Sequence, residues 1–270
     1  LNDVRRATQI LGPALDLARR ANAHLIGLHV YPGLIAAPPV AMPYGTGVVG
    51  AAMGAEREES DKIRAIFDEA TRGATLVPEW REVKATHADL GAIVLEQSRA
   101  ADLVVAGQTD PDWDLSPVLD FPERLAMSSG RPVLVVPHAG VFRSVGKRVT
   151  IAWAGRRESA RAVFDALPLL TQAEAVQLLT IAHKDEKRLD VSPETEIAAS
   201  LARHGVKVTL RRSEAITTSV PDEILNRLAD DSSDLLVMGA YGHSRLREFV
   251  FGGVTREIAR HMTVPTLLAH

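Results

Sequence analysis

The sequence predicts an α/β protein made of two similar halves, each a mostly parallel sheet covered by helices. Apolar runs of strand length alternate with amphipathic segments of helix length along nearly the whole chain, which is typical of sheets built from βαβ units. Residues 102–107 (DLVVAG) match residues 234–239 (DLLVMG) 132 positions later, and residues 131–138 match residues 264–270 at nearly the same offset. Two matches at one spacing indicate a duplicated unit of about 130 residues.

The first half is predicted to begin with a helix. Apolar residues recur at helical spacing over residues 4–21, and Asn2 or Asp3 is a suitable N-cap. Residues 33–54 are rich in glycine, alanine and proline, which favours a long loop that we interpret as a lid or partner-binding segment. The remaining elements expected in this half are strands at residues 24–31, 80–85, 102–107 and 132–137 and helices at residues 56–72, 87–101 and 122–129.

The second half repeats this order but starts with a strand. We expect domains at residues 1–140 and 147–270, joined by a short connector. The first half has no strand ahead of its first helix, so we expect the equivalent strand to lie upstream of Leu1, outside the numbered residues. The elements expected in the second half are strands at residues 148–153, 175–182, 206–210, 234–238 and 265–269 and helices at residues 157–170, 193–204, 221–229 and 252–262.

Composition excludes several classes of protein. The chain has 270 residues, and its 46% hydrophobic and 24% charged residues supply an ample core. A net charge of -3 gives no global basic field for nucleic acid or an anionic membrane. The absence of cysteine excludes disulfides and thiolate metal sites and is compatible with a reducing compartment. No apolar run approaches the roughly 18 residues of a membrane span, and residues 1–9 carry no secretory signal, so a cytoplasmic location is expected.

A glycine-punctuated loop follows the apolar strand at residues 235–238. Gly239 and Gly242 are followed by nine residues and then by Gly252 and Gly253, which open an amphipathic helix. Glycines let backbone N–H groups approach an anion, and a helix N-terminus adds unpaired donors and a favourable dipole. The spacing therefore predicts a phosphate site. The alternative interpretation is a sharp turn with tight helix packing and no ligand.

This motif, its place after the fourth strand and the duplication together resemble the universal stress protein (UspA-like) superfamily in its tandem-domain form. The resemblance covers nearly the whole chain. It implies that each half is a Rossmann-like five-stranded parallel sheet, similar to that of the adenine-nucleotide α-hydrolases. It also implies that residues 132–137 (PVLVVP) and 265–269 (PTLLA) pair across a pseudo-twofold axis. The chain would then be an intrachain pseudo-dimer, compatible with a further homodimer.

The ATP-binding branch of this family carries Gly-x2-Gly-x9-Gly-(Ser/Thr), and the resemblance implies which residues contact the ligand. Some would shape the loop beside the ribose and phosphates, some would offer N–H groups or a hydroxyl to the phosphates, and some would line the strand ends and the base. These residues are Gly239, Gly242, Gly252, Gly253, Val254, Thr255, Met238, Ile181, Ala152 and Ala154. The implied ligand is ATP, with Mg²⁺, or another phosphate-bearing small molecule. No catalytic residue and no metal ligand is expected.

Two positions depart from the family pattern. Gly253 stands where the family has Ser or Thr, although the hydroxyl of Thr255 is close enough in sequence to replace part of that contact. Ala154 stands where the family has Asp at the end of the first strand. A lost hydrogen bond costs on the order of 1 kcal/mol, so the two departures together are expected to weaken nucleotide binding by about tenfold or more. Arg156 and Arg157 follow at the strand-to-helix turn and are candidates for anion contact.

The first half departs further from the pattern. Gly107 is followed by residues 108–114 (QTDPDWD), with no glycine at the second motif position and with three aspartates that would repel a triphosphate. Residues 121–130 (FPERLAMSSG) also lack the double glycine. We expect this half not to bind nucleotide in the usual way and to serve as a scaffold for the dimer-like core.

Other chemistries fit the residues poorly. The DPDWD run lacks the glycine and glutamate that a calcium loop requires. Gly242-His243-Ser244 is not a nucleophile elbow, and nothing near Ser244 is a suitable base. We therefore predict a stress-response module that binds an adenine nucleotide in its C-terminal half, with at most slow ATP hydrolysis and an unknown protein partner. The alternative is a dimeric interaction scaffold whose glycine loop is purely structural.

Overall fold

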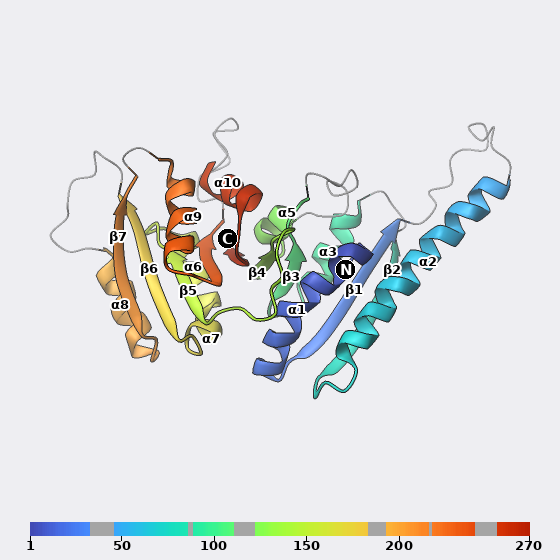
Figure 1. Ribbon diagram of the computed structural model, residues 1–270, viewed down its shortest axis with the longest axis horizontal. Helices are drawn as coiled ribbons and strands as arrows, with labels where there is room; N and C mark the ends of the chain where they lie inside the picture. Colours follow the sequence, from blue (N-terminus) through green and yellow to red (C-terminus); the bar gives the residue numbers. More distant parts are fainter. Residues whose placement is uncertain (33–45, 86–88, 111–121, 183–192, 216–217, 241–252) are drawn as a thin grey trace.

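The computed structural model describes residues 1–270 except 33–45, 86–88, 111–121, 183–192, 216–217 and 241–252. Strands and helices alternate along the chain (Figure 1). The strands are β1 (His24–Pro32), β2 (Val77–Ala85), β3 (Val104–Gly107), β4 (Val133–Val136), β5 (Arg148–Ala152), β6 (Ala175–Ala182), β7 (Val208–Glu214), β8 (Leu235–Gly239) and β9 (Thr266–Ala269). The helices are α1 (Val4–Ala21), α2 (Thr46–Thr71), α3 (Leu90–Ser98), α5 (Pro122–Ser128), α6 (Arg157–Asp165), α7 (Leu167–Leu170), α8 (Pro193–Arg203), α9 (Val220–Asp230) and α10 (Gly253–His261).

Seven strands form one sheet in the order β3-β4-β9-β8-β5-β6-β7. All neighbouring pairs are parallel except β4 and β9, which pair antiparallel with Leu134 opposite Leu267. This pairing joins the terminal strands of the two halves, as the resemblance implied, and an antiparallel contact between equivalent strands is what a twofold relation requires. The prediction that these two short apolar strands pair is confirmed.

The C-terminal half contributes five parallel strands with helices on both faces (Figure 1). Successive residues of β8 point to opposite faces, so Leu235 and Val237 pack with α6 and α8, whereas Leu236 and Met238 pack with α9 and α10. A strand buried on both faces needs apolar residues at every position, which explains the continuous run in β8. The second of these cores continues into the N-terminal half through Leu125 on α5 and its neighbours.

Local signals set the ends of the helices. In α1, the Asp3 carboxylate accepts a hydrogen bond from the Arg5 backbone nitrogen at 2.8 Å, and Asn22 ends the helix in the left-handed conformation, with φ of 49°. In α9, the Ser219 side chain caps the first turn and Pro221 lies within it. The helix expected at residues 157–170 is instead two helices, α6 and α7. The expectation of one helix was wrong because Pro168 has no N–H to continue the ladder from α6.

The N-terminal half does not form one sheet. Strands β1 and β2 pair with each other in parallel and make a separate two-stranded sheet, while β3 and β4 belong to the seven-stranded sheet. The five-stranded sheet implied for this half is therefore corrected to two pieces. The long loop expected at residues 33–54 is also corrected in part, because α2 begins at Thr46. Alanines and a methionine in this stretch favour a helix and offset its glycines.

Candidate functional site

The carboxyl ends of β5 and β8 meet at the centre of the C-terminal half. Ala152, at the end of β5, lies opposite Met238 on β8. After β5 the chain moves outward through β6 to β7, and it then returns to β8 on the other side of β5. Parallel sheets bind ligands at such a switch point, outside the carboxyl ends of the strands.

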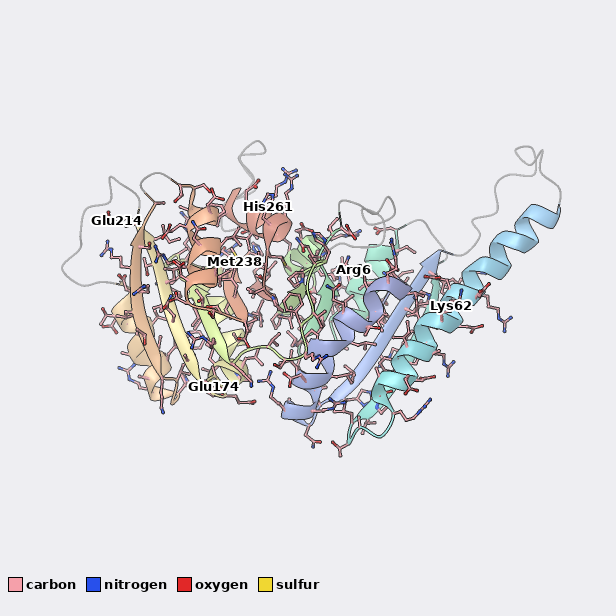
Figure 2. All side chains as sticks on the ribbon, viewed as in Figure 1. Arg6, Lys62, Glu174, Glu214, Met238 and His261 are labelled. Carbon is pink, nitrogen blue, oxygen red and sulfur yellow. The ribbon has the colours of Figure 1, made fainter. Side chains whose placement is uncertain are left out.

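Four of the predicted contact residues pack in one apolar cluster at this edge. Met238 is 5% exposed, and Ala152, Ile181 and Val254 are partly buried against the same cluster. These residues come from β8, β5, β6 and the first turn of α10, and Figure 2 labels Met238 within the C-terminal half. The structure thus brings together residues that are up to about 100 positions apart in sequence. They form an apolar surface beside the carboxyl ends of β5, β6 and β8.

Gly239 has a packing role. A Cβ at this position would lie 2.5 Å from both the Glu158 carbonyl carbon and the Ser159 backbone nitrogen. Real Cβ atoms do not approach backbone this closely, so the first turn of α6 occupies the space that a side chain would need. The absence of a side chain at Gly239 is therefore required by the packing of α6 against β8, whether or not a ligand binds.

The first turn of α10 carries no acidic residue. No described residue would lie within 4 Å of a Cβ at Gly253, so none of the described contacts requires glycine at this position. Thr255 is 5% exposed, whereas Arg256 beside it is exposed. By contrast, α6, α8 and α9 all carry a carboxylate in the first turn. The positive end of the α10 dipole is thus not matched by an acidic side chain of its own first turn.

The turn from β5 to α6 is exposed and carries two cations. Ala154, Gly155, Arg156 and Arg157 are all exposed, and Gly155 has φ of 64°, in the left-handed region that favours glycine. Burial of Glu158 acts to raise the pKa of its carboxyl group, but the ion pair with Arg157, a hydrogen bond from the Glu158 backbone and the nearby His270 together outweigh burial, and the net pKa is lowered. Glu158 therefore stays ionised with its charge compensated locally.

Several predicted residues cannot be placed. Gly242 and Gly252 lie outside the described residues. Of the ten predicted contact residues, the other eight lie on β5, β6 and β8, in the turn after β5 and in the first turn of α10. Ligand binding by the glycine motif thus stays a prediction. At Gly239 the structure shows a packing reason for the glycine.

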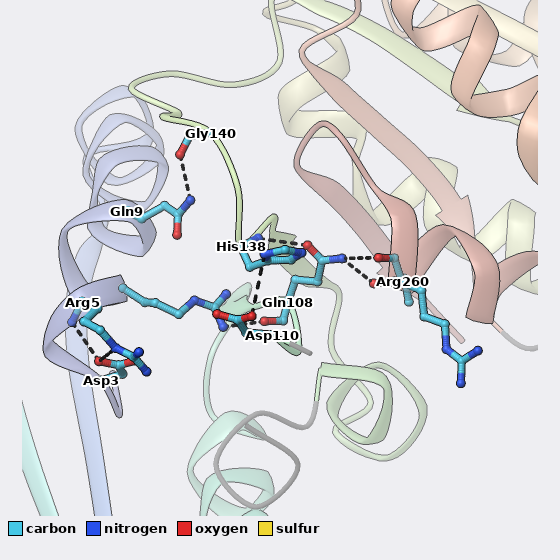
Figure 3. Close-up of polar contacts among 10 residues, drawn as sticks. Asp3, Arg5, Gln9, Gln108, Asp110, His138, Gly140 and Arg260 are labelled. Carbon is cyan, nitrogen blue, oxygen red and sulfur yellow. Dashed lines mark hydrogen bonds and ion pairs between the residues drawn. The ribbon is translucent and has the colours of Figure 1, made fainter. Parts of the chain in front are cut away.

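The equivalent position in the N-terminal half is occupied by protein contacts (Figure 3). Gln108 is 1% exposed, and its side-chain nitrogen donates to the carbonyl oxygens of Ala259 and Arg260, both at 2.9 Å. Its side-chain oxygen accepts from the His138 backbone nitrogen at 2.9 Å. Gln108 therefore caps the C-terminal end of α10 and ties the two halves together.

A second contact fills the space beside Gln108. Arg6 on α1 is 6% exposed, and its Nη1 donates to the Gln108 carbonyl oxygen at 2.5 Å. A Cβ on Gly107 would lie 2.6 Å from Arg6 Nη2. Arg6 thus occupies the place beside Gly107 that Glu158 occupies beside Gly239, and Figure 2 labels Arg6 in this half. Sequence reasoning missed this contact because Arg6 reaches the strand end from about 100 residues away.

No helix among the described residues is long and apolar enough to cross a membrane. Within the same residues, no three His, Asp or Glu side chains come together as metal ligands.

The fold and the strand-end site define a class: a mostly parallel α/β sheet with helices on both faces and a helix N-terminus beside the carboxyl ends of its strands. Residues 146–270 match the sequence model of the universal stress protein family. Universal stress protein Slr1230 of Synechocystis sp. is 27% identical over 146 residues, which are 54% of this chain and 49% of that protein. The chain thus spans about half the length of the curated relative it matches.

Solved structures show the same fold over nearly the whole chain. A universal stress protein from Archaeoglobus fulgidus matches 97% of this chain and 90% of its own, with a TM-score of 0.68 and 14% identity. A putative universal stress protein from Pseudomonas aeruginosa matches 95% of this chain and 86% of its own, with a TM-score of 0.55 and 14% identity. The match to the universal stress protein family thus lies in residues 146–270, and the solved structures extend the likeness in fold to nearly the whole chain.

Proposed function

We propose that the chain is a stress-response module that binds an adenine nucleotide, such as ATP with Mg²⁺, or another phosphate-bearing small molecule. Binding takes place in the C-terminal half only, without efficient catalysis. The proposal includes two domains, at residues 1–140 and 147–270, and a cytoplasmic location. It also includes an unknown protein partner that recognises the nucleotide-bound form. The adenine base would lie on the apolar surface near Ile181 and Met238, and the phosphates would lie at the start of α10.

The observation that carries this proposal is the first turn of α10. It begins beside the carboxyl ends of β5 and β8, it offers backbone N–H groups at Gly253 and Val254, and it has no acidic side chain. A phosphate at this place would match the positive end of the helix dipole and accept hydrogen bonds from those N–H groups. The described residues therefore fit a phosphate group, although Ala154 supplies no carboxylate for the rest of a nucleotide.

A substitution at Gly253 separates ligand binding from folding. Because no described residue lies within 4 Å of a Cβ at this position, we expect Gly253→Asp to be accommodated and its charge to stabilise the helix start by about 0.3–1 kcal/mol. The same charge repels a phosphate by about 1–4 kcal/mol at a separation near 4 Å, depending on local screening. Affinity for ATP with Mg²⁺ should therefore fall at least fivefold, while the melting temperature holds or rises.

The matched control is Gly253→Asn, which has nearly the same shape without the charge. We expect Gly253→Asn to keep ATP binding within about threefold of the unmodified chain, since it adds no repulsion. Fluorescence or calorimetric titration with ATP and Mg²⁺ measures both variants. If Gly253→Asp and Gly253→Asn bind ATP equally well, the phosphates do not lie at the start of α10 and the proposal fails.

A second candidate function is a dimeric interaction scaffold without nucleotide. The packing requirement at Gly239 and the Gln108 contacts between the halves favour it, because both explain sequence features without any ligand. Titration with ATP distinguishes the candidates directly, since a scaffold gives no saturable binding.

A further inference from the structure

The carboxyl end of β7 and the first turns of α9 bring a serine, a glutamate and an arginine together. Ser213 is the next-to-last residue of β7, and its hydroxyl donates a hydrogen bond to Glu223 Oε1. Arg227, one turn further along α9, donates to the same oxygen from Nε at 2.8 Å. We call these three residues the Glu223 cluster. Because β7 runs parallel to β6, the cluster lies at the same edge of the sheet as the candidate site.

The Glu223 carboxylate is buried, yet one of its oxygens is available. Glu223 is 7% exposed, and both hydrogen bonds to its side chain end on Oε1. Among the described residues, Oε2 accepts no hydrogen bond. The hydrogen bond from Ser213 and the ion pair with Arg227 outweigh burial and lower the pKa of the Glu223 carboxyl group, so this group is ionised near neutral pH. An ionised carboxylate only accepts hydrogen bonds, and Oε2 is therefore an acceptor held in one place.

The Glu223 cluster borders the apolar surface of the candidate site. Ile181 on β6 is the register partner of Ser213 on β7. Such partners on neighbouring strands lie about 5 Å apart, and their side chains point to the same face. Ile224, the residue after Glu223, packs in the same apolar cluster as Ile181 and Met238. A group that lies on Ile181 is therefore within reach of the Glu223 carboxylate.

The order of the strands sets the direction in which a bound nucleotide would extend. From β8, which precedes α10 in the chain, the sheet continues through β5 and β6 to β7 (Figure 1). A nucleotide with its phosphates at the start of α10 and its base on Met238 and Ile181 points the far edge of the base toward β7. In adenine this edge carries the 6-amino group, which is a hydrogen-bond donor. The donor would thus face the acceptor Oε2 of Glu223.

The N-terminal half, for which no nucleotide site is proposed, does not repeat this cluster. The counterpart of α9 in that half is α3, whose first turn carries no acidic residue. The counterpart of β7 is β2 (VPEWREVKA), which contains no serine or threonine. The Glu223 cluster is therefore a feature of the half with the candidate site, and the fold that the two halves share does not require it.

We propose that Glu223 makes the site specific for adenine, because its Oε2 accepts a hydrogen bond from the 6-amino group of a base that lies on Ile181. This inference rests on the nucleotide site proposed above and adds the choice of base to it. Ser213 and Arg227 are positioning residues, since they hold the carboxylate and do not touch the base. A base with an oxygen at position 6, such as hypoxanthine or guanine, brings a second acceptor against Oε2. The site therefore discriminates against ITP and GTP.

ATP and ITP test this proposal because they share the ribose and the triphosphate and differ in the base edge that would face Glu223. Titration of the full chain with each nucleotide and Mg²⁺ gives the ratio of the two dissociation constants. We expect the unmodified chain to bind ATP at least about tenfold more tightly than ITP, because ITP loses a hydrogen bond to a charged group. In Glu223→Gln, an amide N–H group takes the place of Oε2 and donates to the oxygen of hypoxanthine. The preference for ATP should then disappear or reverse.

The matched control is Asp222→Asn, which removes the same charge from an exposed side chain one residue earlier in α9. It should leave the preference for ATP unchanged. Melting temperatures are measured for every variant, and a folding defect alone would weaken ATP and ITP binding together without changing their ratio. Ser213→Ala, which keeps the carboxylate but removes one of its two supports, should lower the preference by about threefold.

Three results would overturn the inference and leave the nucleotide site standing. They are saturable but equal binding of ATP and ITP by the unmodified chain, an unchanged preference in both Glu223→Gln and Ser213→Ala, and an equal change of preference in Asp222→Asn. Absence of binding for both nucleotides would instead refute the proposed function, and this inference with it.

Discussion

Gly239 and Gly253 belong to one glycine motif, yet the structure predicts opposite effects when each is changed to alanine. At Gly239 the new methyl carbon would lie 2.5 Å from backbone atoms of Glu158 and Ser159. Ordinary contact begins near 3.4 Å, so the first turn of α6 must move by roughly 1 Å. Unlike a side chain, the α6 backbone has no other rotamer that would remove this overlap. Overpacking of this kind destabilises the folded state by about 1–3 kcal/mol.

Gly253→Ala is the matched control because its methyl group would have no described residue within 4 Å. Replacing glycine by alanine within a helix stabilises by about 0.5–1 kcal/mol. Urea unfolding followed by circular dichroism measures both variants. We expect the midpoint to fall for Gly239→Ala and to hold or rise for Gly253→Ala. A Gly239→Ala variant as stable as the unmodified chain would refute the packing explanation for this glycine.

Two further predictions concern the N-terminal half. Gln108→Leu removes the three hydrogen bonds of a buried side chain, one of them fully buried and two partly buried, and should lower the free energy of unfolding by about 2–3 kcal/mol. Gln9→Leu removes one exposed hydrogen bond to Gly140 and should change the free energy of unfolding by less than about 1 kcal/mol in the same urea titration. Burial lowers the pKa of His29 despite its hydrogen bond to the Leu1 carbonyl, so the folded state binds a proton less readily than the unfolded state and stability should fall as pH drops below about 6.5. Thermal melting at pH 7.5 and 5.5 should show a smaller loss for His29→Asn, and an equal loss would contradict the assignment.

The duplication made much of the fold predictable. Equivalent apolar runs at residues 102–107 and 234–239 indicated equivalent strands, a prediction that rests on a recurring local pattern. The β4–β9 pairing was instead implied by the resemblance to the universal stress proteins, because no local pattern specifies which strands pair. Strand ends were less predictable: β7 is Val208–Glu214 rather than residues 206–210, because pairing with β6 extends it beyond its apolar residues.

Contacts between distant segments were not predictable. The glycine spacing indicated a loop that could hold a phosphate, but only the structure shows that Gly239 is required by α6. Likewise, residues 108–114 looked unsuitable for nucleotide because of their aspartates, while the buried contacts of Gln108 with α10 and Arg6 depend on elements about 100 or more residues away. Such contacts follow from the packing of whole elements and leave no local signal.

The central claim is that one half of the chain, the C-terminal one, binds a nucleotide. Isothermal titration of the full chain with ATP and Mg²⁺ tests this most directly because it counts sites. We predict saturable binding of one ATP per chain that is lost in the Gly242→Asp, Gly252→Asp double variant. Two sites per chain, binding that survives in the double variant, or no heat at millimolar ATP would contradict the claim.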